Sequence, residues 1–323
     1  MLTFLGVAFS IYGAMPFYAL GKVWQVFPQA AWLAWALSFW GLVMTLSPFI
    51  LWQITRQNWH GAALATSWVT YLWMGFLFLF CCTALLLDFA QALPALFGFR
   101  WQLEAAVKLP AITLLALLLT GYGLVAARNI QVEEIKITTP MLPPEIGRVT
   151  IAQISDLHLG MMLGDNFLQS VIARLSEFQP DVVVATGDIV DSQGDHLNAL
   201  AKRFRTLQPP MGLFAVTGNH EYLAGLEPSL LFLRNAGFTV LRGQAAEAGG
   251  IILVGVDDHT AGAALNQEVK LDTKEALGAV PRDKFVVLLK HQPVIDQDTP
   301  FNLQLSGHIH GGQIFPFGVL PWL

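Results

Sequence analysis

Charged residues are distributed very unevenly along this chain of 323 residues. Only six of its 41 charged side chains lie within residues 1–127, and the rest of the chain has an ordinary soluble composition. An uncharged stretch of about 20 apolar residues is long enough to cross a lipid bilayer as a helix. The sequence therefore predicts an all-α transmembrane domain at 1–127, a linker at 128–148 and a soluble domain at 149–323.

Four uncharged stretches reach the length of a membrane span. They lie at 2–21, 30–53, 63–87 and 109–127. The first stretch lacks the basic start and the small-residue cleavage site of a secretion signal, so we expect a permanent helix there. Acidic and basic residues are missing from the middle of each span, which favours a four-helix anchor over an ion pathway.

The orientation of the anchor is not decided by the charges of its loops. Four spans place both termini on the same side, and Lys and Arg number three on each side. Because nothing indicates export, we expect a multi-pass protein of the inner membrane with a cytoplasmic soluble domain. Both cysteines, Cys81 and Cys82, lie in the third stretch. This excludes a disulfide framework or a cysteine zinc site in the soluble domain.

Apolar runs alternate with amphipathic segments in the soluble half, and this alternation is typical of an α/β domain. Helices are expected at Asp165–Phe178 and Leu197–Thr206. Strands are expected at 149–155, 181–186, 212–217, 238–241, 251–256, 285–289 and 303–306, with a further strand at Glu133–Thr138 in the linker.

Five short polar motifs follow the expected strands. In chain order they are Asp156-Leu157-His158, Gly187-Asp188, Gly218-Asn219-His220-Glu221, His291 and Gly307-His308-Ile309-His310. Loops that follow the strands of an open α/β sheet converge at one edge, where ligands usually bind. Carboxylate, imidazole and amide groups together suit a pair of divalent metals. The five motifs therefore predict one metal centre at this edge.

The order of the motifs resembles the calcineurin-like metallophosphoesterase superfamily. Within it, the chain is similar to membrane-anchored bacterial members related to UDP-2,3-diacylglucosamine hydrolase. The resemblance covers about residues 130–323 and implies a four-layer α-β-β-α sandwich with two divalent ions, for which Mn, Fe, Zn or Ni are suitable. The implied ligands are Asp156, His158 and His310 on one metal, Asn219, His291 and His308 on the other, and Asp188 as a bridge.

Other polar residues near the motifs have less definite roles. His220 resembles the family's non-ligand histidine, a catalytic residue that contacts phosphate or protonates the leaving oxygen. Glu221 is expected to support the site. Asp191 is expected either to hydrogen-bond in the same loop or to cap its turn. Asp257-Asp258-His259 could form a further metal site, but a structural loop is the preferred interpretation.

Members of this superfamily usually continue well beyond the Gly-His-x-His motif. Here thirteen residues follow His310. We therefore expect a domain that is truncated at its C-terminus, with a second sheet that is short of strands and exposes an apolar edge.

The expected function is that of a membrane-anchored phosphoesterase with two metals. It would hydrolyse a phosphodiester or pyrophosphate bond with a metal-activated water. A lipid-linked substrate is attractive because the spans keep the site near the bilayer. The alternatives are a phosphomonoesterase or nuclease of the same superfamily, or a non-catalytic membrane interaction or transport protein with a degenerate soluble half. The net charge of −5 disfavours a nucleic-acid partner.

Overall fold

The structure is a computed structural model that describes residues 2–57, 59–99, 101–191, 196–265, 269, 273–278, 280–295 and 299–310. Residues 311–323, and with them the expected truncation, lie outside the described part. The chain divides into two compact units, Met1–Asn129 and Ile130–Leu323. The predicted boundaries at 127 and 148 stay predictions.

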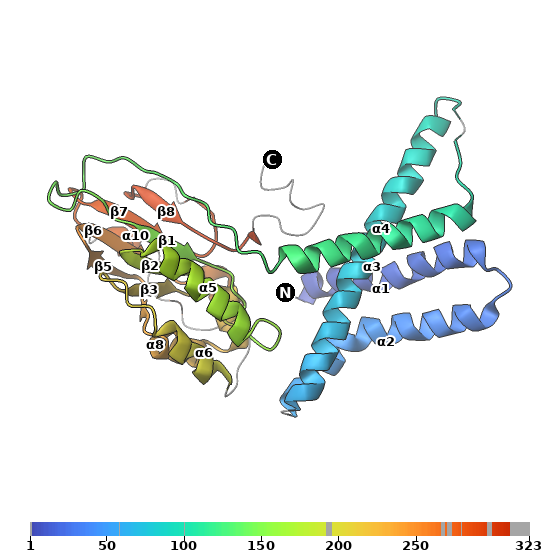
Figure 1. Ribbon diagram of the computed structural model, residues 1–323, viewed down its shortest axis with the longest axis horizontal. Helices are drawn as coiled ribbons and strands as arrows, with labels where there is room; N and C mark the ends of the chain where they lie inside the picture. The colour runs from blue at the N-terminus through green and yellow to red at the C-terminus, as the bar shows by residue number, and fades with distance from the viewer. Residues whose placement is uncertain are drawn as a thin grey trace. The chain divides into compact units, whose positions relative to one another are not determined.

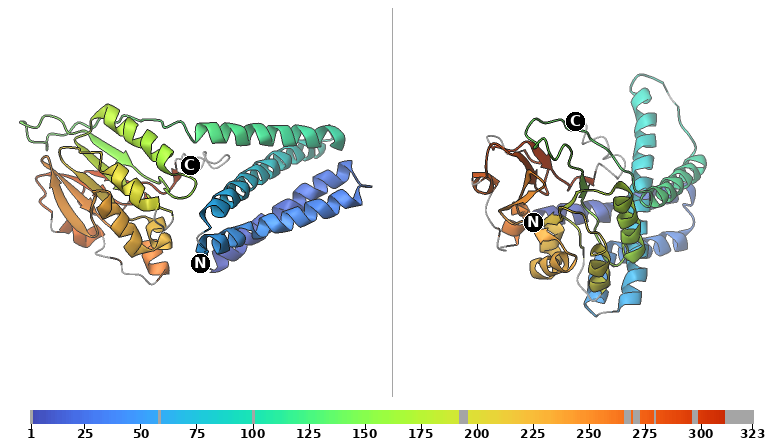
Figure 2. Two further views of the ribbon diagram at one scale, coloured as in Figure 1. Left: turned by 60° about the horizontal axis from the view of Figure 1, so that its bottom comes forward. Right: turned by 60° about the vertical axis from the view of Figure 1, so that its left-hand side comes forward.

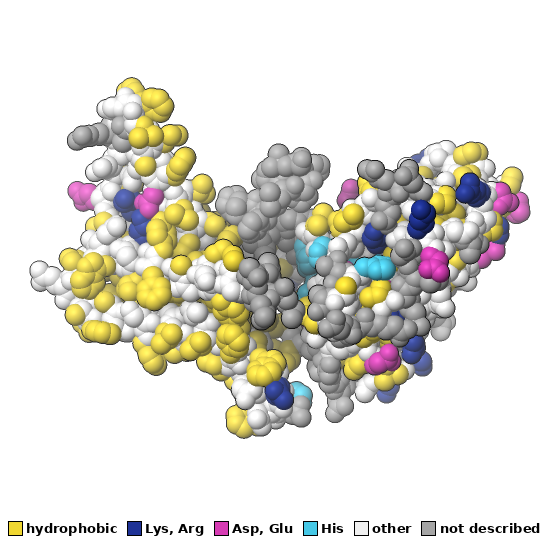
Figure 3. Space-filling view, turned by 180° about the vertical axis from the view of Figure 1, so that it is seen from behind, with side chains coloured by type: hydrophobic (Ala, Val, Ile, Leu, Met, Phe, Trp, Pro, Cys, Tyr) yellow, Lys and Arg dark blue, Asp and Glu magenta, His cyan; other side chains and the backbone are white. Residues whose placement is uncertain are grey.

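The first unit is helical (Figures 1 and 2). Its helices are α1 (Leu2–Val26), α2 (Ala31–Arg56), α3 (His60–Ala95) and α4 (Ala105–Ala126). By length and composition, α2, α3 and α4 could each cross a membrane. Large apolar side chains cover much of the surface of this unit (Figure 3), and Trp35, for example, is 78% exposed. Such a surface is costly in water and suits a lipid environment.

Three of the charged residues in the first unit meet one another. Lys22 of α1 forms an ion pair with Asp88 of α3, and Lys108 of α4 lies with its Nζ 3.9 Å from Asp88 Oδ1. Tyr18 also donates a hydrogen bond to Asp88 over 2.8 Å, and Lys108 donates one to Gln91 over 3.0 Å. This network links α1, α3 and α4 and lowers the cost of keeping these charges in an apolar unit.

The second unit contains two four-stranded sheets. The first sheet is parallel, in the order β1 (Ile151–Ile154), β2 (Val182–Thr186), β3 (Leu213–Val216) and β4 (Thr239–Val240). The second has the order β5 (Gln244–Ala248), β6 (Ile251–Gly255), β7 (Phe285–Leu289) and β8 (Leu303–Leu305). In this sheet β5 is antiparallel to β6, and β6, β7 and β8 are parallel.

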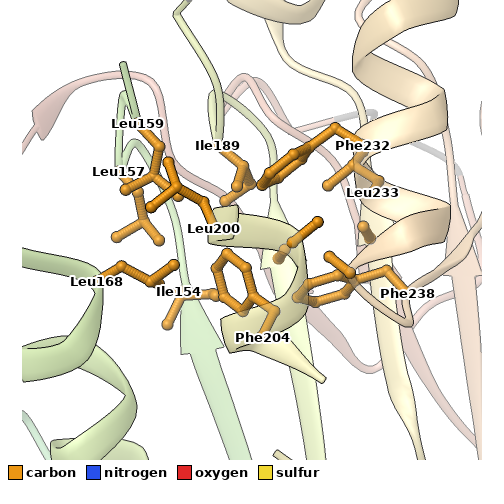
Figure 4. Close-up of a cluster of buried hydrophobic side chains, with 14 of the residues drawn as sticks. Ile154, Leu157, Leu159, Leu168, Ile189, Leu200, Phe204, Phe232, Leu233 and Phe238 are labelled. Atoms are coloured by element: carbon orange, nitrogen blue, oxygen red, sulfur yellow. The ribbon is translucent and has the colours of Figure 1, made fainter. Parts of the chain in front are cut away.

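In the described part of the second unit, six helices accompany these sheets. They are α5 (Asp165–Phe178), α6 (His196–Phe204), α7 (Asn219–Ala224), α8 (Leu226–Asn235), α9 (His259–Ala264) and α10 (Thr273–Gly278). One buried cluster packs α5, α6 and α8 against the first sheet through side chains such as Leu168, Phe204 and Leu233 (Figure 4). In α5, buried Leu168, Val171 and Leu175 recur at helical spacing, which explains why this segment forms an amphipathic helix.

Two further clusters involve the second sheet. One joins the facing sides of both sheets, with Val184 and Phe214 from the first and Leu253 and Val287 from the second. The other packs Leu277 of α10 and its neighbours against strands β6 and β7. All residues of β2, β6 and β7 are buried, which matches their continuous apolar sequences.

The α/β class expected for the soluble half is confirmed, but one local prediction is wrong and one strand was not predicted. The described residues Glu133–Thr138 form no strand. In the predicted linker, Ile130 packs against the cluster under the helices, and Met141 and Leu142 pack against the cluster between the sheets. Strand β5 was not expected, because its sequence Gln-Ala-Ala-Glu-Ala contains no β-branched or aromatic residue.

Two leucines of α8 provide a matched test of the core. Leu233 is fully buried, whereas Leu231 on the same helix is 57% exposed. We expect Leu233→Ala to lower the free energy of unfolding of the second unit by about 2–5 kcal/mol, because it leaves a cavity. Leu231→Ala should change it by less than about 0.5 kcal/mol. Pulse proteolysis in urea measures both, and equal effects would contradict this packing.

Candidate metal centre

The predicted site residues lie just beyond the carboxyl ends of strands. Asp156, Asp188 and Asn219 follow β1, β2 and β3 of the first sheet, and His291 and His308 follow β7 and β8 of the second. Strands β1, β2 and β3 are parallel to one another, and so are β7 and β8. The loops that follow them therefore emerge at one edge of each sheet. The structure brings all seven predicted ligands into two neighbouring groups.

The first group contains Asp156, His158 and His310. The Nε2 atoms of the two histidines lie 3.1 Å apart, and His310 Nε2 lies 3.4 Å from Asp156 Oδ1. The imidazole rings are stacked with centroids 4.9 Å apart. Three electron-donating atoms thus face one small volume.

The second group contains Asn219, His291 and His308, with Asp188 beside them. Asn219 Oδ1 lies 3.1 Å from His291 Nε2 and 3.0 Å from His308 Nδ1, and those two nitrogens are 3.2 Å apart. Asp188 Oδ2 lies 3.2 Å from His291 Nε2. Ligands bound at about 2.1 Å to one metal are separated by about 3.0–3.4 Å. The donor atoms of both groups therefore fit a divalent cation.

Five of these residues have a left-handed backbone. The φ angles are 53° at Asp156, 47° at His158, 54° at Asp188, 76° at His308 and 51° at His310. Among the described residues other than glycine, Gln179 at the end of α5 is the one further example. Asp and His tolerate this conformation better than most residues, yet it is uncommon and accumulates at functional sites. The loops are therefore shaped to direct these side chains.

Two motif glycines allow the carboxylates to approach the neighbouring loops. A Cβ atom at Gly307 would collide with Ser155 Oγ and Asp156 Oδ2. At Gly218, it would collide with Asp188 Oδ1 and lie 2.7 Å from the Asp188 nitrogen. Only glycine fits where these chain segments pass so closely.

Glu221 fixes the loop that carries Asp188. Its fully buried carboxylate accepts hydrogen bonds from the backbone nitrogens of Asp188, Ile189 and Val190 at 2.9, 2.8 and 3.2 Å, and from that of Gly218 at 2.7 Å. Burial and the neighbouring Asp188 charge raise the pKa of Glu221, while the backbone donors oppose this shift. Glu221 thereby joins the loops after β2 and β3.

Asp191 has a more specific position than the sequence suggested. Its Oδ1 atom lies 2.7 Å from His158 Nδ1 and 2.5 Å from His220 Nδ1. A carboxylate only accepts hydrogen bonds, so each Nδ1 carries the proton and leaves Nε2 as the other functional atom. Asp191 thus orients a predicted ligand and the predicted catalytic histidine. The spacing Gly-Asp-x-x-Asp after β2 was the available signal.

The charges of the site shift several pKa values. Burial alone would raise the pKa of Asp188. The His291 side chain and the backbone N–H of His220 have the larger, opposite effect and hold that pKa below its usual value. Burial lowers the pKa of His291, and Asp188 more than offsets this and raises it to about 9. At His220, Asp191 likewise overcomes burial and raises the pKa. A metal bound by His291 must displace the proton that Asp188 stabilises.

Asp257, Asp258 and His259 belong to none of the groups of metal-capable side chains among the described residues. The interpretation of this segment as a structural loop is therefore the better one. Asp257 forms an ion pair with Arg242 whose shortest separation is 2.8 Å, from Nη2 to Oδ2.

We expect Glu221→Gln to destabilise the second unit by about 1–3 kcal/mol, because its amide N–H₂ would face backbone donors and leave one of them without an acceptor. Exposed Glu227 in the first turn of α8 is the matched control, and Glu227→Gln should have little effect. Pulse proteolysis in urea compares them. A Glu221→Gln variant as stable as the wild type would show that these hydrogen bonds do not hold the loop.

Comparison with known proteins identifies the family of this chain. The model of the calcineurin-like phosphoesterase family matches residues 149–312. A metallophosphoesterase of Aquifex aeolicus is 42% identical over 207 residues, which cover 63% of this chain and 78% of that protein. A transmembrane protein with a metallophosphoesterase domain from Danio rerio is 33% identical over 229 residues, or 65% of this chain and 52% of that protein.

The other comparisons add less. This chain spans about half the length of several curated relatives, including those of Helicobacter pylori and Bos taurus. A solved nuclease of Pseudomonas putida has 17% identity and a TM-score of 0.27, over 50% of this chain and 61% of that one, which is too distant to carry an argument. The family model and the Aquifex relative suffice: the chain belongs to the calcineurin-like phosphoesterase family.

Proposed function

We propose that this chain is a membrane-anchored phosphoesterase that uses two divalent ions to hydrolyse a phosphodiester or pyrophosphate bond. The observation that carries the proposal is the pair of neighbouring donor groups, each with atoms 3.0–3.4 Å apart. Two divalent ions would neutralise charge on the phosphate group and would lower the pKa of a bound water molecule.

The proposed ligands divide between the two groups. Asp156, His158 and His310 would hold one ion, and Asn219, His291 and His308 the other. Asp188 would bridge them, because a carboxylate has an oxygen for each cation. The Oδ2 atom of Asp188 faces His291, and its Oδ1 atom accepts a hydrogen bond of 2.8 Å from the backbone N–H of His220. This mixed nitrogen and oxygen set suits Mn, Fe, Zn or Ni.

His220 is the proposed proton donor to the leaving oxygen. Asp191 holds its Nδ1, and the ring lies edge-on to His158 with centroids 4.5 Å apart. The side chain is partly exposed, so its Nε2 can reach a bound phosphate ester. The pKa raised by Asp191 favours the protonated ring, which is the form that a general acid requires.

Apolar helices in the first unit and exposed apolar side chains in the ligand segments support a lipid-linked substrate. Leu223, Ile295 and Ile309 are each at least half exposed, and they lie in the segments that follow β3, β7 and β8. Exposed apolar side chains therefore occur in the same segments as the proposed ligands, which would suit an amphipathic phosphate ester. Such a substrate would agree with a relationship to UDP-2,3-diacylglucosamine hydrolase.

The remaining architectural proposals follow from the packing. A four-layer α-β-β-α sandwich is supported by the clusters between the sheets and beneath α5, α6, α8 and α10. We propose that α1 joins α2, α3 and α4 as a fourth span. An even number of spans would place the start of the chain and the catalytic domain on the same side of the inner membrane, and we propose the cytoplasmic side.

We expect His220→Asn to retain both ions but to lower kcat by about 10²–10⁴-fold, the usual contribution of general acid catalysis. Metal content by mass spectrometry and turnover should be measured on the same preparation. His259→Asn, which changes an exposed histidine outside the donor groups, is the control. Loss of metal in His220→Asn would instead make His220 a ligand.

The type of ester can be tested with two model substrates. With Mn²⁺ added, purified full-length protein should hydrolyse bis(p-nitrophenyl) phosphate faster than p-nitrophenyl phosphate, and EDTA should abolish both reactions. A preference for the monoester would identify a phosphomonoesterase. Failure to bind Mn²⁺, Fe²⁺ or Zn²⁺ would favour a non-catalytic membrane protein.

A further inference from the structure

The ligands of the second donor group come from different sheets. Asn219 follows β3 in the first sheet, whereas His291 and His308 follow β7 and β8 in the second. Hydrogen-bonded strand pairs fix positions within a sheet but not between the two sheets. The distance of 3.1 Å between Asn219 Oδ1 and His291 Nε2 therefore depends on contacts between the sheets, which are the buried cluster that joins them and the polar contacts between their loops.

Asp257 connects the two sheets. It follows β6 of the second sheet, and its carboxylate contacts two residues that follow strands of the first sheet. Thr217 Oγ1 donates a hydrogen bond to Asp257 Oδ1 over 2.8 Å. Arg242, which follows β4, donates from Nε to both oxygens at 2.9 and 3.0 Å. Thr217 lies two residues before Asn219, so this contact reaches the loop that carries a ligand.

Asp258 continues the connection to the other ligand loop. Its Oδ2 accepts a hydrogen bond of 2.9 Å from the side-chain amide of Gln292, the residue after His291. The Asp258 backbone N–H also points to Thr217 Oγ1 at 3.4 Å. One pair of adjacent aspartates thus connects the segment before Asn219 to the segment after His291.

Both aspartates of this network are buried. Asp257 is 1% exposed and Asp258 4%. A carboxylate in such a place is costly unless hydrogen bonds and opposite charge compensate it, so its partners are held firmly in position. Neither aspartate belongs to a group of metal-capable residues in the described part of the chain. Their contacts indicate a role in positioning and not in binding metal.

We propose that Thr217, Asp257, Asp258 and Gln292 form an intersheet clamp that positions Asn219 and His291 for the second metal ion. The inference rests on the proposed two-metal function. Partners of this kind, which orient the metal ligands from behind, typically change metal affinity 10–100-fold when they are removed. The clamp should affect the second ion and leave the first, which Asp156, His158 and His310 would bind.

The experiment compares Thr217→Val with Thr217→Ser in the full-length protein. Valine keeps the volume of the side chain but cannot donate to Asp257, whereas serine keeps the hydroxyl group. Mn²⁺ titration by calorimetry gives the two affinities, and electron paramagnetic resonance distinguishes a coupled Mn²⁺ pair from a single ion. We expect Thr217→Val to weaken the second Mn²⁺ by about 10–100-fold, with the coupled signal lost first. Thr217→Ser should retain the affinity for the second Mn²⁺ and the coupled signal.

Two further variants separate this effect from a general loss of structure. Thr206→Val removes an exposed hydroxyl group just after α6, which donates to the Arg203 carbonyl, and should bind Mn²⁺ like the wild type. Gln292→Met breaks the other end of the clamp at a partly exposed position, and it serves if Thr217→Val does not fold. It should also weaken the second Mn²⁺ selectively.

The outcomes distinguish the clamp from the proposed function. If the wild type binds two coupled Mn²⁺ ions and both clamp variants bind them with unchanged affinity, the clamp proposal is overturned and the two-metal proposal stands. Equal weakening of both ions would also overturn it, since the effect would be general. If the wild type binds fewer than two ions, both proposals are wrong.

Discussion

The close approach of electron-rich atoms is the constraint on which the second unit depends. Oxygens and unprotonated nitrogens at 3.0–3.4 Å repel one another unless a proton or cation lies between them. A protein that assembles such a site must stabilise it elsewhere. Here the stabilisation comes from buried cores on both sides of the first sheet and from the backbone donors that surround Glu221. These contacts hold the ends of the strands in place, so the loops can keep a strained, left-handed backbone.

The organisation of the site follows one rule of α/β architecture, and this explains why so much of it was predictable. Buried strands such as β2 and β7 have uninterrupted apolar sequences, and polar motifs begin where they end. Helix α5 was predicted with its observed bounds, because its apolar spacing and flanking residues agree. Chain order together with parallel topology then places the motifs at common edges.

The unpredicted features depend on tertiary contacts that carry little local signal. Strand β5 is formed from a sequence that favours no extended structure and owes its conformation to pairing with β6. Apolar alternation in Glu133–Thr138 suggested a strand, yet a strand requires a partner, which spacing alone does not provide. Asp191 was expected either to hydrogen-bond in its own loop or to cap its turn, because its two imidazole partners come from loops 33 and 29 positions away. The number of ions and their ligands remain predictions for the same reason.

The left-handed backbone at five of the proposed ligand positions has a consequence for the residue types found there. Glycine would relieve the strain at each of them, by about 1 kcal/mol or more. Replacement of one of these residues by glycine would therefore relieve local strain while it removes a proposed metal ligand. Local backbone preference therefore does not explain the residue types at Asp156, His158, Asp188, His308 and His310. At these positions the functional groups of the side chains, and not the conformational preference of the backbone, account for the residue types.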